Sequence, residues 1–277
     1  MKKIRKISAC ILSGIMIFSF AFGFRSFSSE NRVMAAQKEI QLNKTSVSIG
    51  IGEQFQLKSN VPVVHWASEN KKTVSITDKG LIKGLKTGTA KVGAVASRGG
   101  AAECDVTVKK APSSVSISKS TLVLGVGEKY TLTSSVPKDT ASASRKFRSS
   151  NSSAVIMTRS EGQGEILAIK PGISFVTVTT FNGKTATCAV SVKNAPQKVG
   201  ITPKKVVLHV GETCEFDAVL DEDSASAERT FRSNNDVVRM TKTNGRGKCI
   251  AVKEGKARVT VCTYNKKAAS CIVTVVK

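Results

Sequence analysis

The sequence predicts an all-β protein made of three tandem β-sandwich domains. Apolar and other residues alternate with period two in short runs, which is the pattern of half-buried strands. Turn residues separate the runs roughly every 8–12 positions, and no helical periodicity interrupts them. The third observation is an internal repeat, because one phrase occurs three times, at Ile49–Phe55, Leu124–Tyr130 and Leu208–Phe216. Three copies indicate one structural unit that is used three times.

Each copy of the repeated phrase consists of an alternating run, a Gly-Glu pair and a second alternating run. The pairs are Gly52-Glu53, Gly127-Glu128 and Gly211-Glu212. A glycine between two strand-like runs indicates a bend or a turn. We therefore expect a sharp corner between two strands at the same place in every unit.

The first 35 residues have the organisation of a secretory signal peptide. A basic start at Lys2–Lys6 is followed by the apolar run Ile7–Phe24 and by a small-residue cleavage site at Val33–Ala35. We expect an exported, soluble mature protein that begins near Ala36. The alternative is an uncleaved segment that anchors the protein in the membrane, because about 18 mostly apolar residues nearly span a bilayer.

A repeated linker sets the predicted domain boundaries. Lys109–Pro112 and Lys193–Pro196 are 84 residues apart. A proline after a last strand ends the hydrogen-bonded ladder and stiffens the connection. After the signal peptide at 1–35, the predicted domains are 36–111, 112–195 and 196–277.

The first unit has the strand pattern of a small sandwich. The expected strands are 39–50, 54–58, 63–67, 74–76, 81–85, 90–95 and 104–108. A polar turn at 68–70 and a tight turn at Asp78–Gly80 separate strands, and the glycine allows a positive φ. Seven or so short strands are typical of a β-sandwich of about 80 residues.

The other two units follow the same order. Phe147 and Phe231 stand at the place of Trp66, and each of these rings is predicted to fill the centre of its core. Burying a side chain of that size stabilises a domain by several kcal/mol, at roughly 25 cal/mol per Å².

The first unit resembles the bacterial Ig-like group 2 domain. The resemblance rests on valine-rich strands, Gly52-Glu53, the aromatic-x-Ser-x-Asn corner Trp66–Asn70 and the turn Gly88–Ala90. The second and third units depart from the pattern at that last turn, and they carry longer insertions around the aromatic corner. The resemblance extends over 38–277 and implies three immunoglobulin-like domains. It also implies a secreted or surface-exposed protein, similar to the repeats of invasin-type and intimin-type adhesins.

Cysteine positions favour buried thiols over a disulfide framework. Cys104, Cys188 and Cys271 occupy one equivalent position per unit, on the face of the alternating valines, and are read as small core residues. Cys10 lies at the start of the apolar run, whereas a lipoprotein cleavage site follows such a run, so lipidation is not expected. The chain has no Cys-x-x-Cys pair and its two histidines lie far apart, which argues against zinc.

The third unit adds Cys214, Cys249 and Cys262. Cys214 and Cys249 stand where the other units have apolar core residues. A disulfide between Cys214 and Cys271 is an open alternative in an oxidising compartment, because connectivity is not readable from sequence.

Positive charge is spread evenly over the chain. The net charge is +23, of which +18 remains after the signal peptide, with +6 in each unit. Such a surface attracts polyanions, and the expected partners are an anionic cell-wall polymer, a surface glycan or a protein ligand. Nucleic acid is not expected as a partner because the protein is exported.

Candidate catalytic groups do not converge. His65 and His209 lie in different units, and no nucleophile-base arrangement or phosphate-binding loop is present, so we expect neither an enzyme nor a cofactor. The acidic loop Asp221–Asp223 has no spacing typical of calcium, and no metal site is predicted.

One cluster of cations gives a candidate site. Two equivalent strands place basic residues beside the core aromatic and could present an outward stripe for phosphate, sulfate or carboxylate groups. The residues are Arg145, Lys146, Arg148, Arg229 and Arg232. The alternative is a solvated strand face whose charges prevent edge-to-edge aggregation.

Two functions follow from these observations. The first is adhesion, or binding to a surface glycan or protein, by a secreted or wall-associated protein. The second is a structural spacer that its evenly spread positive charge retains on the anionic wall.

Overall fold

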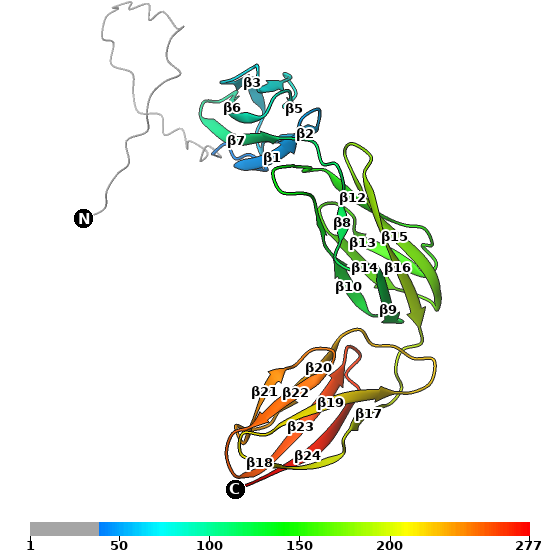
Figure 1. Ribbon diagram of the computed structural model, residues 1–277. Coiled ribbons are helices and arrows are strands. Elements are labelled where there is room, and N and C mark those ends of the chain that lie inside the picture. The colour runs from blue at the N-terminus through cyan, green and yellow to red at the C-terminus, as the bar shows by residue number, and fades with distance from the viewer. Residues whose placement is uncertain (1–38) are drawn as a thin grey trace, which may run out of the picture. The chain divides into compact units, whose positions relative to one another are not determined.

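The computed structural model describes residues 39–277 (Figure 1). The predicted signal peptide, its cleavage site and Cys10 lie outside the described residues. The described part is all-β, with 24 strands and no helix, as the sequence predicts. It accordingly contains no helix long and apolar enough to cross a membrane.

The hydrophobic core is divided into three clusters, and each cluster lies between two sheets. They extend from Ile40 to Val108, from Val115 to Val192 and from Ile201 to Val275. We refer to the parts of the chain around them as the first, second and third domains. The tandem immunoglobulin-like fold class is therefore confirmed, while the boundaries at 111/112 and 195/196 stay predictions.

Each domain has one four-stranded sheet that contains its longest β-hairpin, which we call the hairpin sheet. In the first domain its order is β1 (Ser46–Gly50), β7 (Ala101–Lys109), β6 (Gly88–Ala96) and β3 (Val63–Ser68). The edge strand β1 runs parallel to β7, and the other pairs are antiparallel. The opposite sheet consists of β2 (Gln54–Gln56), β5 (Leu81–Gly84) and β4 (Val74–Ile76).

The second domain repeats this arrangement. Its hairpin sheet has the order β12 (Arg145–Ser149), β15 (Gly172–Thr180), β16 (Thr185–Lys193) and β9 (Thr121–Gly125). The opposite side carries β10 (Lys129–Leu132), β14 (Gly164–Ala168) and β13 (Val155–Arg159), and a short pair, β11 (Ser134–Ser135) with β8 (Ser116–Ile117). The edge strand β9 is again parallel to its neighbour.

The third domain has two four-stranded sheets. The hairpin sheet has the order β18 (Lys205–His209), β24 (Ala268–Val276), β23 (Gly255–Thr263) and β20 (Arg229–Ser233). The opposite sheet has the order β17 (Val199–Thr202), β19 (Thr213–Leu220), β22 (Gly247–Ala251) and β21 (Val238–Lys242). Because β19 continues without a break, it pairs with both β22 and β17.

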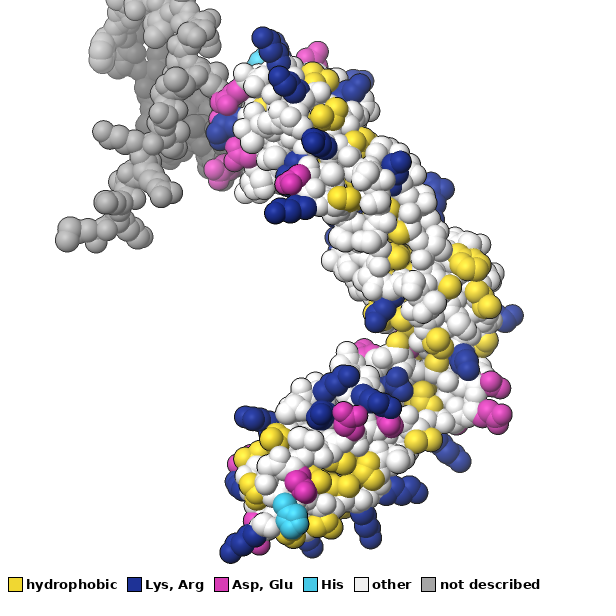
Figure 2. Space-filling model, in the orientation of Figure 1, with side chains coloured by type: hydrophobic (Ala, Val, Ile, Leu, Met, Phe, Trp, Pro, Cys, Tyr) yellow, Lys and Arg dark blue, Asp and Glu magenta, His cyan; other side chains and the backbone are white. Residues whose placement is uncertain are grey.

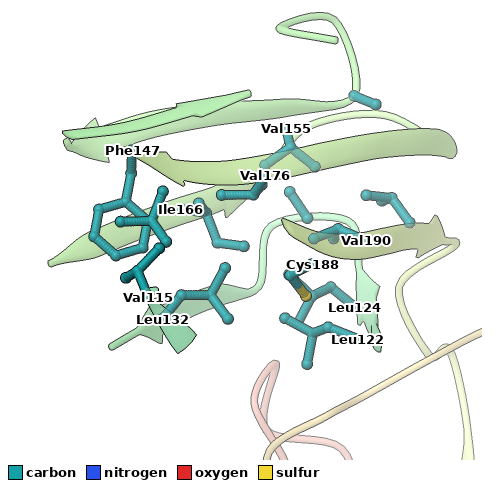
Figure 3. Packing of buried hydrophobic residues seen from close by; sticks show 14 residues of the cluster. Val115, Leu122, Leu124, Leu132, Phe147, Val155, Ile166, Val176, Cys188 and Val190 are labelled. Carbon is teal, nitrogen blue, oxygen red and sulfur yellow. The ribbon is translucent and has the colours of Figure 1, made fainter. Parts of the chain in front are cut away.

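Alternation along the long hairpins fills the cores. In the second domain Val176, Cys188 and Val190 are fully buried and belong to the same core cluster as Phe147, which is 1% exposed (Figure 3). Cys104 and Cys271 are fully buried at the equivalent positions. The prediction that this cysteine acts as a small core residue is therefore confirmed in all three domains.

The six described cysteines are free thiols, so the alternative of a Cys214–Cys271 disulfide is not found. Cys214 lies opposite Cys249 in the register of β19 and β22, and both pack in the core of the third domain. Burial raises the pKa of Cys271 to about 11. Cys262 is different, because it lies on the outward side of the hairpin sheet and is half-buried.

The first strand is shorter than the sequence predicts. A continuous strand over 39–50 was expected, but β1 begins only at Ser46, and Leu42 makes a single bridge with Ser59. The Asn43 side chain interrupts the ladder because it binds two backbone groups itself. Its amide donates to the carbonyl of Gln56 at 3.1 Å and accepts from the N–H of Lys58 at 2.9 Å.

Candidate binding surface

The outward faces of the hairpin sheets carry most of the residues that the sequence singles out. Lys146 and Arg148 alternate with the buried Phe147 on β12 and are exposed. Arg232 is exposed at the equivalent place on β20, next to the buried Phe231. These three cations occupy the outward stripe that the sequence predicts.

Arg145 and Arg229 lie on the other side of their strands. Both are half-buried and share the side of the core aromatic, because they stand two residues before it. Arg145 Nη1 donates to the carbonyl of Ser134 at 2.8 Å, and in the described part the Nε atoms of both arginines have no hydrogen-bond partner. The prediction that all five cations face outward is therefore wrong for these two.

Three further cations complete a surface on the third domain. Arg258 and Lys256 lie on the outward face of β23, and Lys205 lies on β18. Arg232 on β20 lies opposite Thr260 on β23, and Thr260 is the next outward residue after Arg258 on β23. Ile272 is opposite both Arg258 and Lys205, which places all of these side chains on one face. We call Lys205, Arg232, Lys256 and Arg258 the basic face.

Sequence reasoning missed Lys205, Lys256 and Arg258, although a signal was present. In the run Gly255–Val261 the two cations alternate with Ala257 and Val259, which are buried. The alternation alone therefore places Lys256 and Arg258 on the outward face. The adjacency of Lys205 depends on the parallel pairing of β18 with β24, which the sequence pattern does not reveal.

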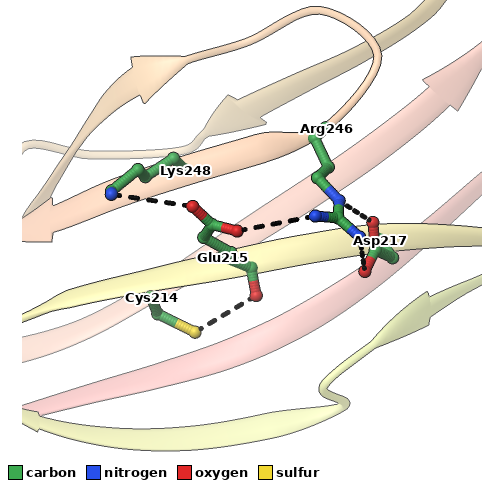
Figure 4. A network of polar contacts seen from close by, with 5 residues as sticks. All are labelled: Cys214, Glu215, Asp217, Arg246 and Lys248. Atoms are coloured by element: carbon green, nitrogen blue, oxygen red, sulfur yellow. Dashed lines mark hydrogen bonds and ion pairs between the residues drawn. The ribbon is translucent and has the colours of Figure 1, made fainter.

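The basic face lacks compensating carboxylates. Within residues 39–277 none of its four side chains takes part in an ion pair. The opposite sheet of the same domain differs, as Figure 4 shows. There Arg246 Nε contacts Asp217 at 2.7 Å, and both Arg246 and Lys248 contact Glu215, at 3.8 and 3.6 Å. The cations of the basic face are therefore not neutralised by carboxylates, whereas Arg246 and Lys248 on the opposite sheet are.

Hydroxyl groups lie between the cations. Thr260 and Ser270 share a hydrogen bond of 2.8 Å on the outward face of the third domain. Thr177 and Thr187 make the same contact at 2.9 Å in the second domain, beside Arg148. The cations can bind anionic groups, and the neighbouring hydroxyls can donate hydrogen bonds to a polyhydroxylated chain and accept them from it.

A shallow depression adjoins the basic face at Arg232. It has a volume of about 540 Å³ and lies along the edge between β20 and β21. Of its apolar lining residues, Val252 is 46% exposed and Met240 is half-buried, whereas Phe231 and Val238 are almost fully buried. A ligand that contacts Arg232 can therefore continue onto an apolar surface.

The acidic loop of the third domain has a structural role. The Asp221 carboxylate accepts hydrogen bonds from the backbone N–H groups of Lys198 and Gln197, both at 3.1 Å. These backbone bonds lower the pKa of Asp221. Among the described residues, no group of three His, Cys, Asp or Glu side chains is placed to hold a metal ion.

A family model identifies the first domain. The model of the bacterial Ig-like domain (group 2) matches residues 36–106. This domain belongs to that family. The match agrees with the resemblance carried by Gly52-Glu53, Trp66–Asn70 and Gly88–Ala90.

Comparisons with individual proteins extend over more of the chain. An uncharacterised protein of Clostridium acetobutylicum (strain ATCC 824) is 27% identical over 210 residues, which is 71% of this chain, and the chain spans 21% of the length of that relative. Among solved structures, domains 1–6 of the surface layer protein SbsC are 15% identical, with 86% of this chain and 40% of that chain covered and a TM-score of 0.26. The N-terminal four Ig domains of Dscam1 isoform 1.9 are 12% identical, with 86% and 73% covered and a TM-score of 0.25.

The last feature of the surface is the distribution of its positively charged side chains. In the view of Figure 2, Lys and Arg side chains are found over every domain and are not gathered at one end. On the face that this view shows, positive charge is thus spread over the domains, as the sequence suggests.

Proposed function

We propose that this protein is an exported, non-enzymatic surface protein that binds an anionic glycan polymer through the outward faces of its second and third domains. The observation that carries the proposal is the basic face. Its four cations are exposed, and none of them forms an ion pair with another residue of 39–277. The family match of the first domain supports a surface-associated or extracellular location. The predicted signal peptide supports export.

An extended polymer suits this surface better than a small ligand. The basic face is a sheet surface, and the depression beside Arg232 is shallow and open. Specific small-molecule sites are concave and surround most of their ligand. Cations spaced along neighbouring strands instead match repeated phosphate, sulfate or carboxylate groups, and the intervening hydroxyls match sugar hydroxyls.

The second candidate function is a spacer that diffuse charge retains on an anionic wall. The equal net charge of +6 in each predicted domain favours it. In that case attraction depends on total charge and not on where the charge lies. The two functions therefore predict different responses to the same change in net charge at different places.

A pair of matched double variants separates the two functions. Arg232→Glu with Arg258→Glu reverses two cations of the basic face, and Lys198→Glu with Lys242→Glu reverses two exposed cations away from it in the same domain. The chain from Ala36 onward is bound to immobilised heparin, to immobilised polygalacturonate and to neutral dextran in 0.1 M salt. We expect the first pair to weaken binding to a charged matrix about tenfold, and the control pair less than about twofold, because screening limits each charge to about 10 Å.

The outcomes are distinct. Equal weakening by both pairs would support the spacer and contradict a localised site. Unchanged binding in both would contradict polyanion binding altogether. Loss on heparin alone, or on polygalacturonate alone, would identify sulfate or carboxylate as the preferred group. All four positions are exposed, so the free energy of unfolding should change by no more than about 0.5 kcal/mol.

A further inference from the structure

The Gly-Glu corners of the first two domains hold a buried carboxylate. Glu53 and Glu128 are each only 1% exposed. In both corners the carboxylate accepts a hydrogen bond from the backbone N–H of the glycine three residues earlier, at 2.8 Å for Gly50 and 2.9 Å for Gly125. A buried charge is costly unless its hydrogen bonds are satisfied. One N–H group does not satisfy a carboxylate.

The remaining acceptor sites are filled by the next domain. Glu53 accepts from the N–H of Ala143 at 3.0 Å and of Ser144 at 2.7 Å. Glu128 accepts from the N–H of Ala227 at 3.0 Å and of Glu228 at 2.7 Å. Corresponding distances at the two corners agree within 0.1 Å. The same contact is therefore built twice.

Burial and hydrogen bonding act against each other on these carboxyl groups. Burial raises the pKa of Glu53 and of Glu128, and the backbone N–H groups lower it again. Arg145 also lowers the pKa of Glu53. The half-buried Arg145 thus contributes to this corner rather than to the outward face.

The glycine before each corner leaves room for the next domain. A Cβ atom on Gly50 would lie 2.6 Å from the carbonyl oxygen of Ala141 and 2.6 Å from the ring of Phe181. On Gly125 it would lie 2.3 Å from the carbonyl oxygen of Ala225 and 2.6 Å from the hydroxyl of Tyr264. All of these atoms belong to the following domain, so the glycine is required by close approach between domains.

The following domain supplies two elements to each contact. The first is a loop before the core aromatic, Thr140–Ser144 or Ser224–Glu228, which we call the docking loop. The second is the aromatic residue at the tip of the long hairpin, Phe181 or Tyr264. The hydroxyl of Tyr264 also donates to the carbonyl of Val126 at 2.6 Å.

Each docking loop is held in shape by its own domain. The Ser142 hydroxyl donates to the carbonyl of Ser144 at 3.1 Å, and Ser226 donates to the carbonyl of Glu228 at 2.6 Å. The linker pairs with the loop as well, because the N–H of Ala141 donates to the carbonyl of Lys110 at 3.1 Å. The loop that carries the N–H groups facing the glutamate is thus also hydrogen-bonded to residues other than the glutamate.

The first domain has no docking loop. Its chain passes directly from Asn60 and Val61 into β3, and the tip of its long hairpin is Ser97–Gly100, which contains no aromatic residue. It can offer a corner but cannot receive one.

The third domain has a docking loop, but its own Gly-Glu corner cannot accept one. Glu212 still accepts from the N–H of His209 at 2.7 Å, but it is exposed. His209 stands where the other corners have glycine, and its Nδ1 contacts the carbonyl of Lys277 at 2.8 Å. Since even a Cβ atom clashes at the glycine positions, an imidazole excludes a docking loop altogether.

We propose that the Gly-Glu corner is a directional docking site whose partner is the docking loop and hairpin aromatic of another domain of this kind, and that His209 closes this site on the third domain. With these corners and docking loops, the three domains can form two docked contacts and no third. Whatever lies before the first domain or after the third is not joined to them by this contact.

Hydrogen exchange of single amide groups tests the proposal. In the unchanged protein the N–H groups of Ala143, Ser144, Ala227 and Glu228 should exchange at least tenfold more slowly than exposed amides. Gly50→Ala should accelerate the first pair at least tenfold and leave the second pair unchanged. Gly125→Ala should do the opposite. His209→Ala is the control and should alter neither pair.

A second variant covers the case in which Gly50→Ala disturbs the first domain itself, which the amides of β6 and β7 report. Glu53→Gln leaves one acceptor oxygen for three N–H groups and should accelerate Ser144 at least threefold. Its matched control is Glu212→Gln, which changes the same motif without a docked partner and should affect the third domain only. Unprotected amides in the unchanged protein, or protection that survives both Gly50→Ala and Glu53→Gln, would overturn the proposal.

Discussion

The first and third domains have the same fold but different outward faces. In the first domain Lys91 lies between Glu103 and Asp105, at 3.1 Å from each, and hydrogen bonds to these carboxylates raise the pKa of Lys91. In the third domain Arg258 stands at the equivalent position of the hairpin sheet, with Ile272 opposite it. The inward residues of both domains are alike, so the core maintains the fold while the outward face takes a chemistry of its own.

Truncation of the core aromatic should have the largest effect and should affect both domains alike. Phe231 is fully buried and Trp66 is 8% exposed. We expect Phe231→Ala and Trp66→Ala each to lower the free energy of unfolding of their own domain by about 3–5 kcal/mol. Urea unfolding followed by hydrogen exchange in each domain measures this loss.

The control is Arg232→Ala, a change on the outward face with an expected effect under about 0.5 kcal/mol. A first domain that keeps its stability after loss of Trp66 would contradict the shared core. A large effect of Arg232→Ala would mean that the basic face is structural.

Thiol chemistry should separate the inward and outward faces of one hairpin. Cys271 is fully buried, and burial raises its pKa to about 11, whereas Cys262 lies half-exposed on the outward face. Because the thiolate is the reacting form, iodoacetamide at pH 8 should alkylate Cys262 at least about 100-fold faster than Cys271. Cys104 of the first domain is also buried, so we expect no rapidly alkylated thiol in that domain.

Mass spectrometry of peptides follows the alkylation site by site. In 8 M urea the rates should converge, since unfolding removes the difference in burial. Equal rates in the folded protein would show that the two cysteines do not lie on opposite faces of the sheet.

Conversion of the first domain's face should have the smallest effect. Glu103→Ser with Asp105→Asn removes the carboxylates around Lys91 and makes this face resemble that of the third domain. We expect binding to immobilised heparin to strengthen about two- to threefold, because Lys91 becomes free to contact the polymer. Elution by a salt gradient measures the change.

The matched control is Glu69→Ser with Asp78→Asn, which removes two exposed carboxylates elsewhere in the first domain. The same gain in both variants would show that net charge decides binding. A gain limited to the first variant would show that the face decides it.

Sequence patterns predict the inward half of this molecule well. The period-two alternation identifies the sandwich fold, the buried cysteine of each hairpin and the aromatic at 66, 147 and 231, because a one-residue shift would expose every core side chain. The same alternation places Lys146, Arg148 and Arg232 outward.

Contacts between distant segments could not be predicted in the same way. The parallel pairing that brings Lys205 beside β24 depends on which strands meet at a sheet edge. The role of Gly50 and Gly125 depends on atoms of another domain, and the corner motif alone reads as a turn. The inward position of Arg145 was predictable from its spacing to Phe147, but the cluster of positive charge suggested otherwise.

The parallel edge strand has a mechanical consequence. In every domain an early strand pairs in parallel with the last strand over five residue pairs, β1 with β7, β9 with β16 and β18 with β24. Tension applied along the chain pulls these two strands in opposite directions along their common axis. The load is then shared by all the hydrogen bonds of the pair at once, instead of opening them one after another as in a hairpin pulled apart from its end. A protein held at a surface in moving fluid would resist extension through these three short ladders.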